Sequence, residues 1–121
     1  MNEFSFERLT VYQKARQLVV SVYQLLGEFP NTEKFALCDQ IRRAIISVPS
    51  NIAEQCGRTS LKEKIHFIEI AYGSLMEAYC QLQVSVDLNY ISFEQFNSVR
   101  DAFFDVSRLL NGLSKSYQEK V

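Results

Sequence analysis

Apolar residues recur every three or four positions along four long stretches of the chain. This spacing places them on one face of an α-helix, because the helix turns once every 3.6 residues. The third stretch keeps the alternation longest, from Leu61 to Val86. The pattern predicts an N-terminal arm over residues 1–9 and helices over residues 10–28, 32–56, 60–88 and 92–117.

Local signals mark the ends of these predicted helices. Pro30 ends the first one, because proline has no amide hydrogen with which to continue a helix. Ser60 with Glu63, and Ser92 with Gln95, have the spacing of a capping box, in which two side chains satisfy free backbone amides reciprocally. Four long amphipathic helices with short connections predict an all-α, antiparallel up-and-down four-helix bundle that forms a single domain.

Pro49 lies inside the second predicted helix and could mark either a break or a kink. A break would let Ser50 or Asn51 cap a new short helix. A kink would leave one bent helix, at a cost of roughly 3 kcal/mol for an interior proline. The apolar register passes through Pro49 without a change of phase, from Ile45 to Ile52. We therefore predict one helix, kinked at Pro49.

A polar stripe runs along the second predicted helix beside its apolar face. At 100° per residue its members lie within one sector: Gln40, Arg43, Ser47, Asn51, Glu54 and Arg58. We expect the stripe to meet the Ile45 carbonyl, which Pro49 leaves without an amide donor, and to reach the third helix. The predicted structural polar network consists of Arg43, Ser47, Asn51, Glu54 and Glu77.

Apolar surface also remains on another side of the second helix, along Ile46, Pro49 and Ala53. A four-helix bundle buries one face of each helix, so surplus apolar surface predicts contacts between subunits. Gly73, in the middle of the third helix, predicts the close approach of another helix, because glycine has no side chain to hold backbones apart. A tolerated weak spot is the alternative. The candidate subunit-interface residues are Ile46, Ala53 and Gly73.

The charge balance restricts nucleic-acid binding to a local patch. The chain has 121 residues and a formal net charge of −1, with a sequence pI of about 5.8. It therefore lacks an overall positive field that would attract nucleic acid. Arg42, Arg58, Lys62 and Lys64 are the candidates for phosphate contact. The alternative is a structural role, since Glu54 and Arg58 have the spacing of an ion pair within a helix.

No motif predicts catalysis or a bound cofactor. Glu63 and His66 match the E-x-x-H spacing of di-iron bundles, but such a site needs two of these motifs and two more carboxylates. The chain has one histidine in all, and it has no G-x-S-x-G, P-loop or G-x-G-x-x-G pattern. We expect no catalytic residue, no metal, no cofactor and no small-molecule substrate, and hence a protein that is not an enzyme.

Cysteine use and hydropathy bear on the compartment. Cys38, Cys56 and Cys80 are odd in number and lack C-x-x-C spacing, which is typical of a reducing compartment. The N-terminal residues have no apolar stretch like that of a signal peptide. No apolar run reaches the roughly 18 residues that a membrane span needs. The sequence predicts a cytoplasmic protein without membrane contact.

Five sets of short segments form a recognisable series in chain order: Phe6-Glu-Arg-Leu9 with Tyr12-Gln-Lys-Ala15, Phe29-Pro30 with Glu33, Gln40-Ile-Arg-Arg43, Ser47-Val-Pro-Ser-Asn-Ile-Ala-Glu54, and Ile70-Ala-Tyr-Gly-Ser-Leu75 with Glu77. Together these segments resemble the four-helix-bundle family of 23S rRNA intervening sequence proteins. The resemblance implies an up-and-down bundle that forms a ring-shaped homopentamer. A related branch is the accessory variability protein of diversity-generating retroelements, a basic pentameric barrel that contacts a reverse transcriptase and nucleic acid. This chain departs from the family at Gln55 and Cys56, where glycine and an aromatic residue are frequent.

Two hypotheses for function follow. The first is a non-enzymatic oligomeric bundle, a pentamer by resemblance, that acts as a scaffold or adaptor for RNA, DNA or a nucleic-acid enzyme. The alternative is a protein–protein interaction module that uses the outer apolar lines and binds no nucleic acid. Steep salt dependence of binding is expected of the first and not of the second.

Overall fold

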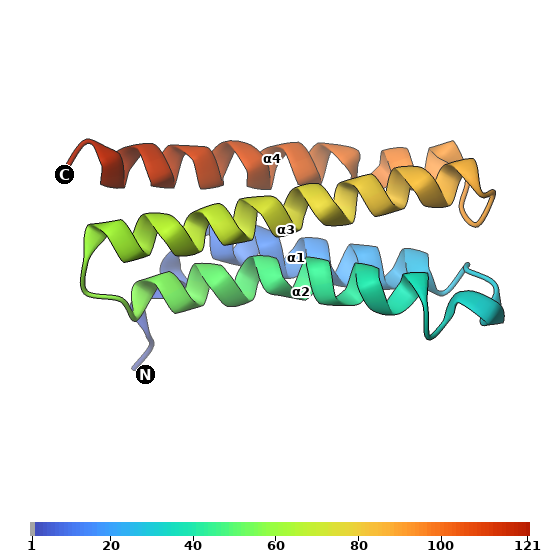
Figure 1. Cartoon of the computed structure of the whole chain (residues 1–121), viewed down its shortest axis with the longest axis horizontal. Helices are drawn as coiled ribbons and strands as arrows, with labels where there is room; N and C mark the ends of the chain where they lie inside the picture. The colour runs from blue at the N-terminus through green and yellow to red at the C-terminus, as the bar shows by residue number, and fades with distance from the viewer. Residues whose placement is uncertain (1) are drawn as a thin grey trace.

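The computed structural model describes residues 2–121 and contains four long helices with two short 3₁₀ turns. The elements in chain order are η1 (Ser5–Arg8), α1 (Thr10–Leu26), η2 (Asn31–Glu33), α2 (Leu37–Cys56), α3 (Leu61–Asp87) and α4 (Phe93–Gln118). Consecutive helices run in opposite directions (Figure 1), and each packs against the next, with α4 closing on α1. The predicted all-α up-and-down bundle is confirmed.

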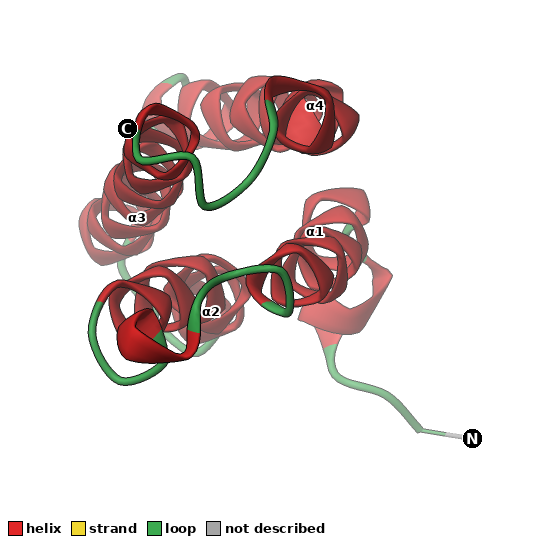
Figure 2. Cartoon of the chain, turned by 90° about the vertical axis from the view of Figure 1, so that its right-hand side faces the viewer, coloured by secondary structure: helices red, strands yellow, loops and turns green. Residues whose placement is uncertain are grey.

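Viewed from its end, the bundle places the four helices at the corners of a square (Figure 2). The α1–α2 and α3–α4 connections lie at one end of the molecule, and the α2–α3 turn lies at the other (Figure 1). Helices α1 and α2 therefore form one edge of the square, and α3 and α4 form the opposite edge. The closest pairing is that of α2 with α3, which joins the two edges.

The helix starts follow from local capping. The Ser60 hydroxyl accepts a hydrogen bond from the Glu63 amide at 3.1 Å and starts α3. At α4 the capping box is complete, since Ser92 accepts from the Gln95 amide at 3.0 Å while its own amide donates to the Gln95 side chain at 2.8 Å. Asn89 turns the chain between these helices with φ of 62°, a left-handed conformation that asparagine tolerates better than most residues.

The start of α2 differs from the sequence expectation, which placed it at residue 32. Residues 31–33 form a 3₁₀ turn instead, and the helix begins at Leu37. The reason is that no side chain between Pro30 and Leu37 packs into the core, and Phe35 is 82% exposed. Helix α1 also ends earlier, at Leu26 rather than Glu28.

One apolar core holds the four helices together. Leu18, Ile45, Leu75 and Val106 contribute from α1, α2, α3 and α4 and are buried completely or almost so. Phe29 in the α1–α2 connection and Ile91 in the α3–α4 connection are also buried, and they cover the same end of the core. No helix within residues 2–121 is both long and apolar enough to cross a membrane.

A polar pair is built into the opposite end of the core. Gln55 on α2 is 0% exposed, and its side-chain oxygen accepts a hydrogen bond from the Tyr117 hydroxyl of α4 at 2.9 Å. Burial raises the pKa of Tyr117, so the hydroxyl keeps its proton and its role as donor over the neutral range. The pair therefore fastens the last turns of α4 to α2.

Replacing Tyr117 with phenylalanine tests this pair. Tyr117→Phe leaves the buried Gln55 oxygen without its donor, and we expect the free energy of unfolding to fall by about 1–3 kcal/mol. Urea unfolding followed by circular dichroism measures the change. Tyr23→Phe is the matched control, because the Tyr23 hydroxyl makes no hydrogen bond within the described chain. Equal stability of the two variants would contradict the assigned role.

Candidate functional site

A shallow apolar groove lies on the outer edge formed by α1 and α2. Its volume is about 440 Å³. The lining residues are Phe6, Tyr12, Arg16, Val19, Val20, Ile46, Pro49, Ser50 and Ala53. Val20 is 58% and Ile46 is 42% exposed. The groove thus contains two of the predicted subunit-interface residues, Ile46 and Ala53, together with Pro49.

The N-terminal 3₁₀ turn forms one wall of this groove. Turn η1 contacts both α1 and α2, and the Phe6 ring meets the Tyr12 ring edge to face with centroids 4.9 Å apart. The sequence treated residues 1–9 as an arm and gave Phe6 no part in a surface. Phe6 and Tyr12 are six positions apart in the sequence, and their rings come into contact only because residues 5–8 fold into a turn.

Pro49 is buried on the inner side of the groove, within a helix that runs unbroken from Leu37 to Cys56. The structure therefore excludes two separate helices at this point. The bend itself stays a prediction. The Asn51 side chain does not meet the Ile45 carbonyl as expected, since it donates to the carbonyl and hydroxyl of Ser47, each at 2.8 Å.

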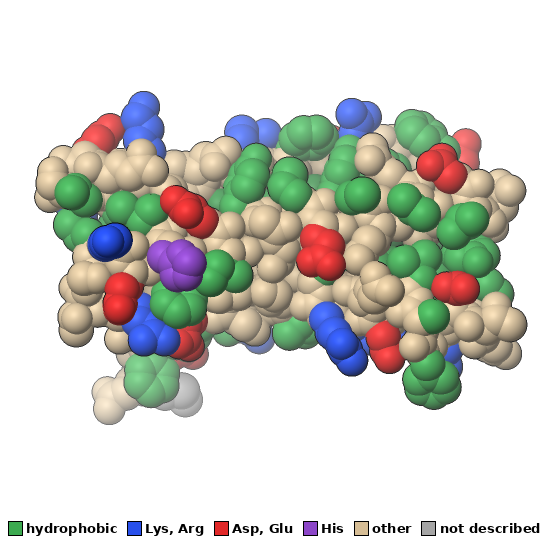
Figure 3. Space-filling model, viewed as in Figure 1, with side chains coloured by type: hydrophobic (Ala, Val, Ile, Leu, Met, Phe, Trp, Pro, Cys, Tyr) green, Lys and Arg blue, Asp and Glu red, His purple; other side chains and the backbone are tan. Residues whose placement is uncertain are grey.

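The opposite edge, between α3 and α4, carries a second apolar surface. A hollow of about 130 Å³ is lined by Tyr72, Met76, Tyr79, Phe103, Phe104 and Ser107. The Tyr79 ring contacts those of Phe103 and Phe104 edge-on, with centroids 5.3 and 6.1 Å away. Met76 and Phe104 are exposed, and hydrophobic side chains follow the line where the two helices meet (Figure 3).

The structure assembles only part of the predicted polar network. Ser47 receives the Asn51 amide and also a hydrogen bond from the Ser74 hydroxyl of α3 at 2.9 Å. This chain of three side chains joins α2 to α3. Ser74 was missed by sequence reasoning, although it follows Gly73 on the face turned toward the second helix.

The other members of the predicted network lie apart from this chain. Glu54 pairs with Arg58 one turn away. Glu77 meets Gln81 at 3.3 Å, and Gln81 reaches Gln40 on α2 at 3.2 Å. Arg43 is exposed and makes no side-chain hydrogen bond within residues 2–121.

Gly73 does not mark a close approach of helices inside the bundle. A Cβ built on this glycine would have no atom of a neighbouring helix within 4 Å, so the position is open on the outside of α3. The prediction of tight packing there is wrong for the single chain. A role for Gly73 between subunits stays a prediction.

The candidate phosphate-contacting residues fall into two separate places. Arg58, Lys62 and Lys64 lie at the α2–α3 turn. Arg58 pairs with Glu54 and stacks over the Phe67 ring at 4.6 Å, and Lys64 donates to the Gln55 carbonyl at 3.0 Å. Lys62 is exposed and has no ion pair in the part of the chain described.

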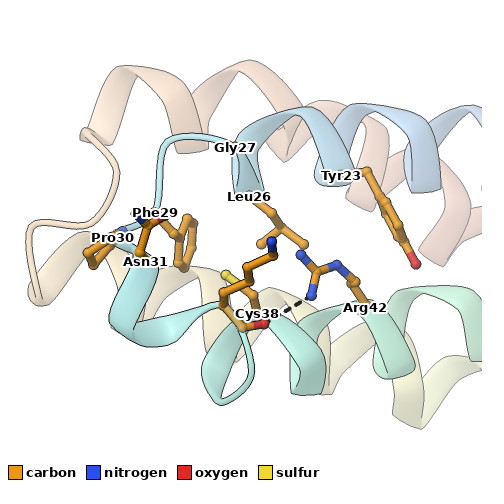
Figure 4. Close-up of a pocket in the computed structure, with 9 residues that line it drawn as sticks. Tyr23, Leu26, Gly27, Phe29, Pro30, Asn31, Cys38 and Arg42 are labelled. Carbon is orange, nitrogen blue, oxygen red and sulfur yellow. Dashed lines mark hydrogen bonds between the residues drawn. The ribbon is translucent and has the colours of Figure 1, made fainter.

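Arg42 lies near the other end of α2, fourteen residues and hence about 21 Å along the helix from its last residue, Cys56, beyond which Arg58 follows in the turn. It donates to the Lys34 carbonyl at 3.2 Å and pairs with Asp39 at 3.0 Å. It lines a pocket of about 290 Å³ between the end of α1 and the start of α2 (Figure 4). Arg42 is therefore held by its own chain and is not part of one patch with Arg58.

The same pocket contains a buried cysteine, Cys38. Burial raises the pKa of its thiol, which more than offsets the lowering effect of nearby Arg42. A thiol with a raised pKa stays protonated at neutral pH and is a poor nucleophile. Across residues 2–121, no three side chains of the His, Cys, Asp and Glu types gather to hold a metal ion. His66 is exposed on α3 beside the Phe67 ring.

The helices and the groove lie within a segment that matches a known family. The model described as 23S rRNA-intervening sequence protein matches residues 7–112. The chain belongs to this family. The match runs from η1 through most of α4 and includes every residue of the α1/α2 groove except Phe6. No curated protein matches the chain.

A solved relative has the same fold. The chain is 26% identical to a protein from Bacteroides thetaiotaomicron, described as having unknown function and as belonging to the S23 ribosomal protein family. The match has a TM-score of 0.79 and covers 87% of this chain and 95% of the other. The structural match to this neighbour supports the four-helix fold, and neither its description nor that of the family model names a reaction.

Replacing Pro49 with alanine tests how much this interior proline lowers the free energy of unfolding. Pro49→Ala restores an amide donor for the Ile45 carbonyl, and we expect the free energy of unfolding to rise by about 1–3 kcal/mol. Denaturant unfolding at one fixed protein concentration measures it. Ser50→Ala, on the exposed side of the same turn, is the control and is expected to change stability by less than about 0.5 kcal/mol. A destabilised Pro49→Ala would mean that burial of the ring outweighs the lost hydrogen bond.

Proposed function

We propose that this family member is a non-enzymatic scaffold that assembles with copies of itself in the cytoplasm. The observation that carries the proposal is the pair of apolar surfaces on opposite edges of the bundle. One is the α1/α2 groove with Val20 and Ile46, and the other is the α3/α4 hollow with Met76 and Phe104. Exposed apolar surface of this kind is typical of interfaces.

The arrangement of the two surfaces favours a ring. They differ in shape and residues, so a contact between identical faces would cover one surface and leave the other in water. A head-to-tail contact, in which the α1/α2 groove of one copy meets the α3/α4 hollow of the next, covers both surfaces and closes when the rotation between copies completes a circle. The family resemblance implies five copies.

Placing a charge in the groove tests the assembly. Ile46→Glu would have to bury a carboxylate against apolar surface, and we expect it to reduce the wild-type assembly to the 14.0 kDa chain. Light scattering after size-exclusion chromatography measures the mass, and circular dichroism checks that the helices persist. Phe35→Glu is the control, because it places the same charge on an exposed apolar residue outside both edges. A wild-type protein of 14.0 kDa at every concentration would refute the proposal.

A second candidate function, contact with nucleic acid, is favoured by the distribution of charge. Dividing each helix at its midpoint separates residues 2–18, 47–74 and 106–121 from the rest. This half, which contains the α2–α3 turn, has nine basic and six acidic side chains, whereas the other half has four basic and eight acidic. A cyclic ring would bring the basic ends of all copies to one face and multiply their charge.

Lys62 is a suitable probe of that face, because it is exposed and forms no ion pair within residues 2–121. Lys62→Glu is expected to weaken binding to a structured RNA at low salt and to flatten the plot of log affinity against log salt by about one unit per contact. Fluorescence anisotropy at several salt concentrations measures both. Lys34→Glu, in the acidic half, is the control. Absence of RNA binding at low salt, or binding that ignores salt, would leave the protein–protein module as the function.

A further inference from the structure

An apolar surface covers the α3–α4 end of the bundle, in the acidic half. Leu88 is 50% and Phe93 is 57% exposed. Beside them a hollow of about 340 Å³ is lined by Gln83, Val86, Asp87, Phe93 and Phe96. Phe96 is buried and forms the floor of this end hollow. The surface therefore offers large apolar side chains around a cavity that has a carboxylate on its rim.

Three carboxylates at this end form no ion pair with the described part of the chain. They belong to Asp87, Glu94 and Glu28. This end also lies in the half of the chain that has four basic and eight acidic side chains, so its charge is negative on balance. Acidic and hydrophobic side chains are visible together toward the right-hand end of the molecule in Figure 3. The negative charge of this surface is therefore complementary to a cationic group supplied by another molecule.

The position of Asp87 strengthens this argument. Asp87 is the last residue of α3, and that turn contains no basic residue. The C-terminus of a helix carries a partial negative charge, so a carboxylate there is unfavourable and a cation is favourable. An external lysine or arginine would relieve the repulsion that the chain itself leaves uncompensated.

We propose that the end hollow docks a basic amphipathic segment of a partner protein, which goes beyond the scaffold function proposed above. The aliphatic stem of a lysine or arginine would lie against Val86 and Phe93, and its charged group would reach Asp87. Apolar neighbours on the segment would cover Leu88. A nucleic acid does not fit, because its phosphates would meet unpaired carboxylates. The self-contact proposed above is centred on Met76, eleven residues and about 16 Å along α3 from Asp87.

The test uses the full chain and a short labelled peptide of leucine and lysine patterned as an amphipathic helix. Fluorescence anisotropy should show binding that weakens as salt rises. The double variant Asp87→Asn/Glu94→Gln should raise the Kd about fivefold, as expected for two exposed ion pairs, and flatten the salt dependence. Its thermal midpoint should stay close to that of wild type, since Asp87 no longer opposes the α3 dipole while Glu94 no longer supports the N-terminus of α4.

Matched controls distinguish binding at this site from nonspecific binding of the peptide. Glu69→Gln/Glu119→Gln removes the same number of charges from the opposite half and should leave the Kd within about twofold. A version of the peptide with glutamate in place of lysine should not bind. Equal Kd values for the two double variants, or a wild type that binds both peptides alike, would overturn the proposal. Light scattering on the same samples measures the mass of the assembly. We expect this mass to be the same in both double variants as in wild type, because neither variant alters the α1/α2 groove or the residues around Met76, so a change in peptide binding would not reflect a change in self-assembly.

Discussion

Each helix of this bundle must keep one apolar stripe against the other three, because a single core of 23 buried apolar residues is the main source of its stability. That requirement fixes the rotation of every helix about its axis. Leu18, Ile45, Leu75 and Val106 point inward with the rest of the core, and the side chains outside the core are left to face a neighbouring helix or water. The properties of the outer surfaces are therefore consequences of how the core is filled.

Helix α2 shows this most clearly, since it has three different faces. Its core stripe includes Ile45. Its polar side joins α3 through Ser47 and Ser74. Its remaining side lines the α1/α2 groove with the exposed Ile46 and the buried Pro49. An interior proline in this helix weakens the single chain.

Charge is also divided along the axis rather than around it. The half with the α2–α3 turn is basic on balance and the half with the α3–α4 turn is acidic, although the whole chain is close to neutral. The net charge of the whole chain therefore does not reveal that its two ends have opposite net charges. In the proposed ring of parallel copies these ends would become two faces, one suited to an anionic partner and one to a cationic partner, and the apolar edges would be turned toward the neighbouring copies.

The sequence by itself determined the four helices, their caps and the bundle, because these depend on residues three or four positions apart. It placed Ile46 and Ala53 on an outer face for the same reason. It misjudged the start of α2, where residues 32–36 lack any side chain that packs inward. The family resemblance was also readable, since its motifs are short and contiguous.

Only the tertiary structure decided which distant side chains meet. Gln55 finds Tyr117 across 62 positions and Ser47 finds Ser74 across 27, and no periodicity within one helix encodes either pair. Phe6 becomes a groove wall only because η1 folds back onto α1 and α2. Gly73 proved open because the neighbouring helices pack on other sides of α3. The spacing of residues within one helix sets the direction in which a side chain points, but the packing of the four helices determines which residues that side chain contacts.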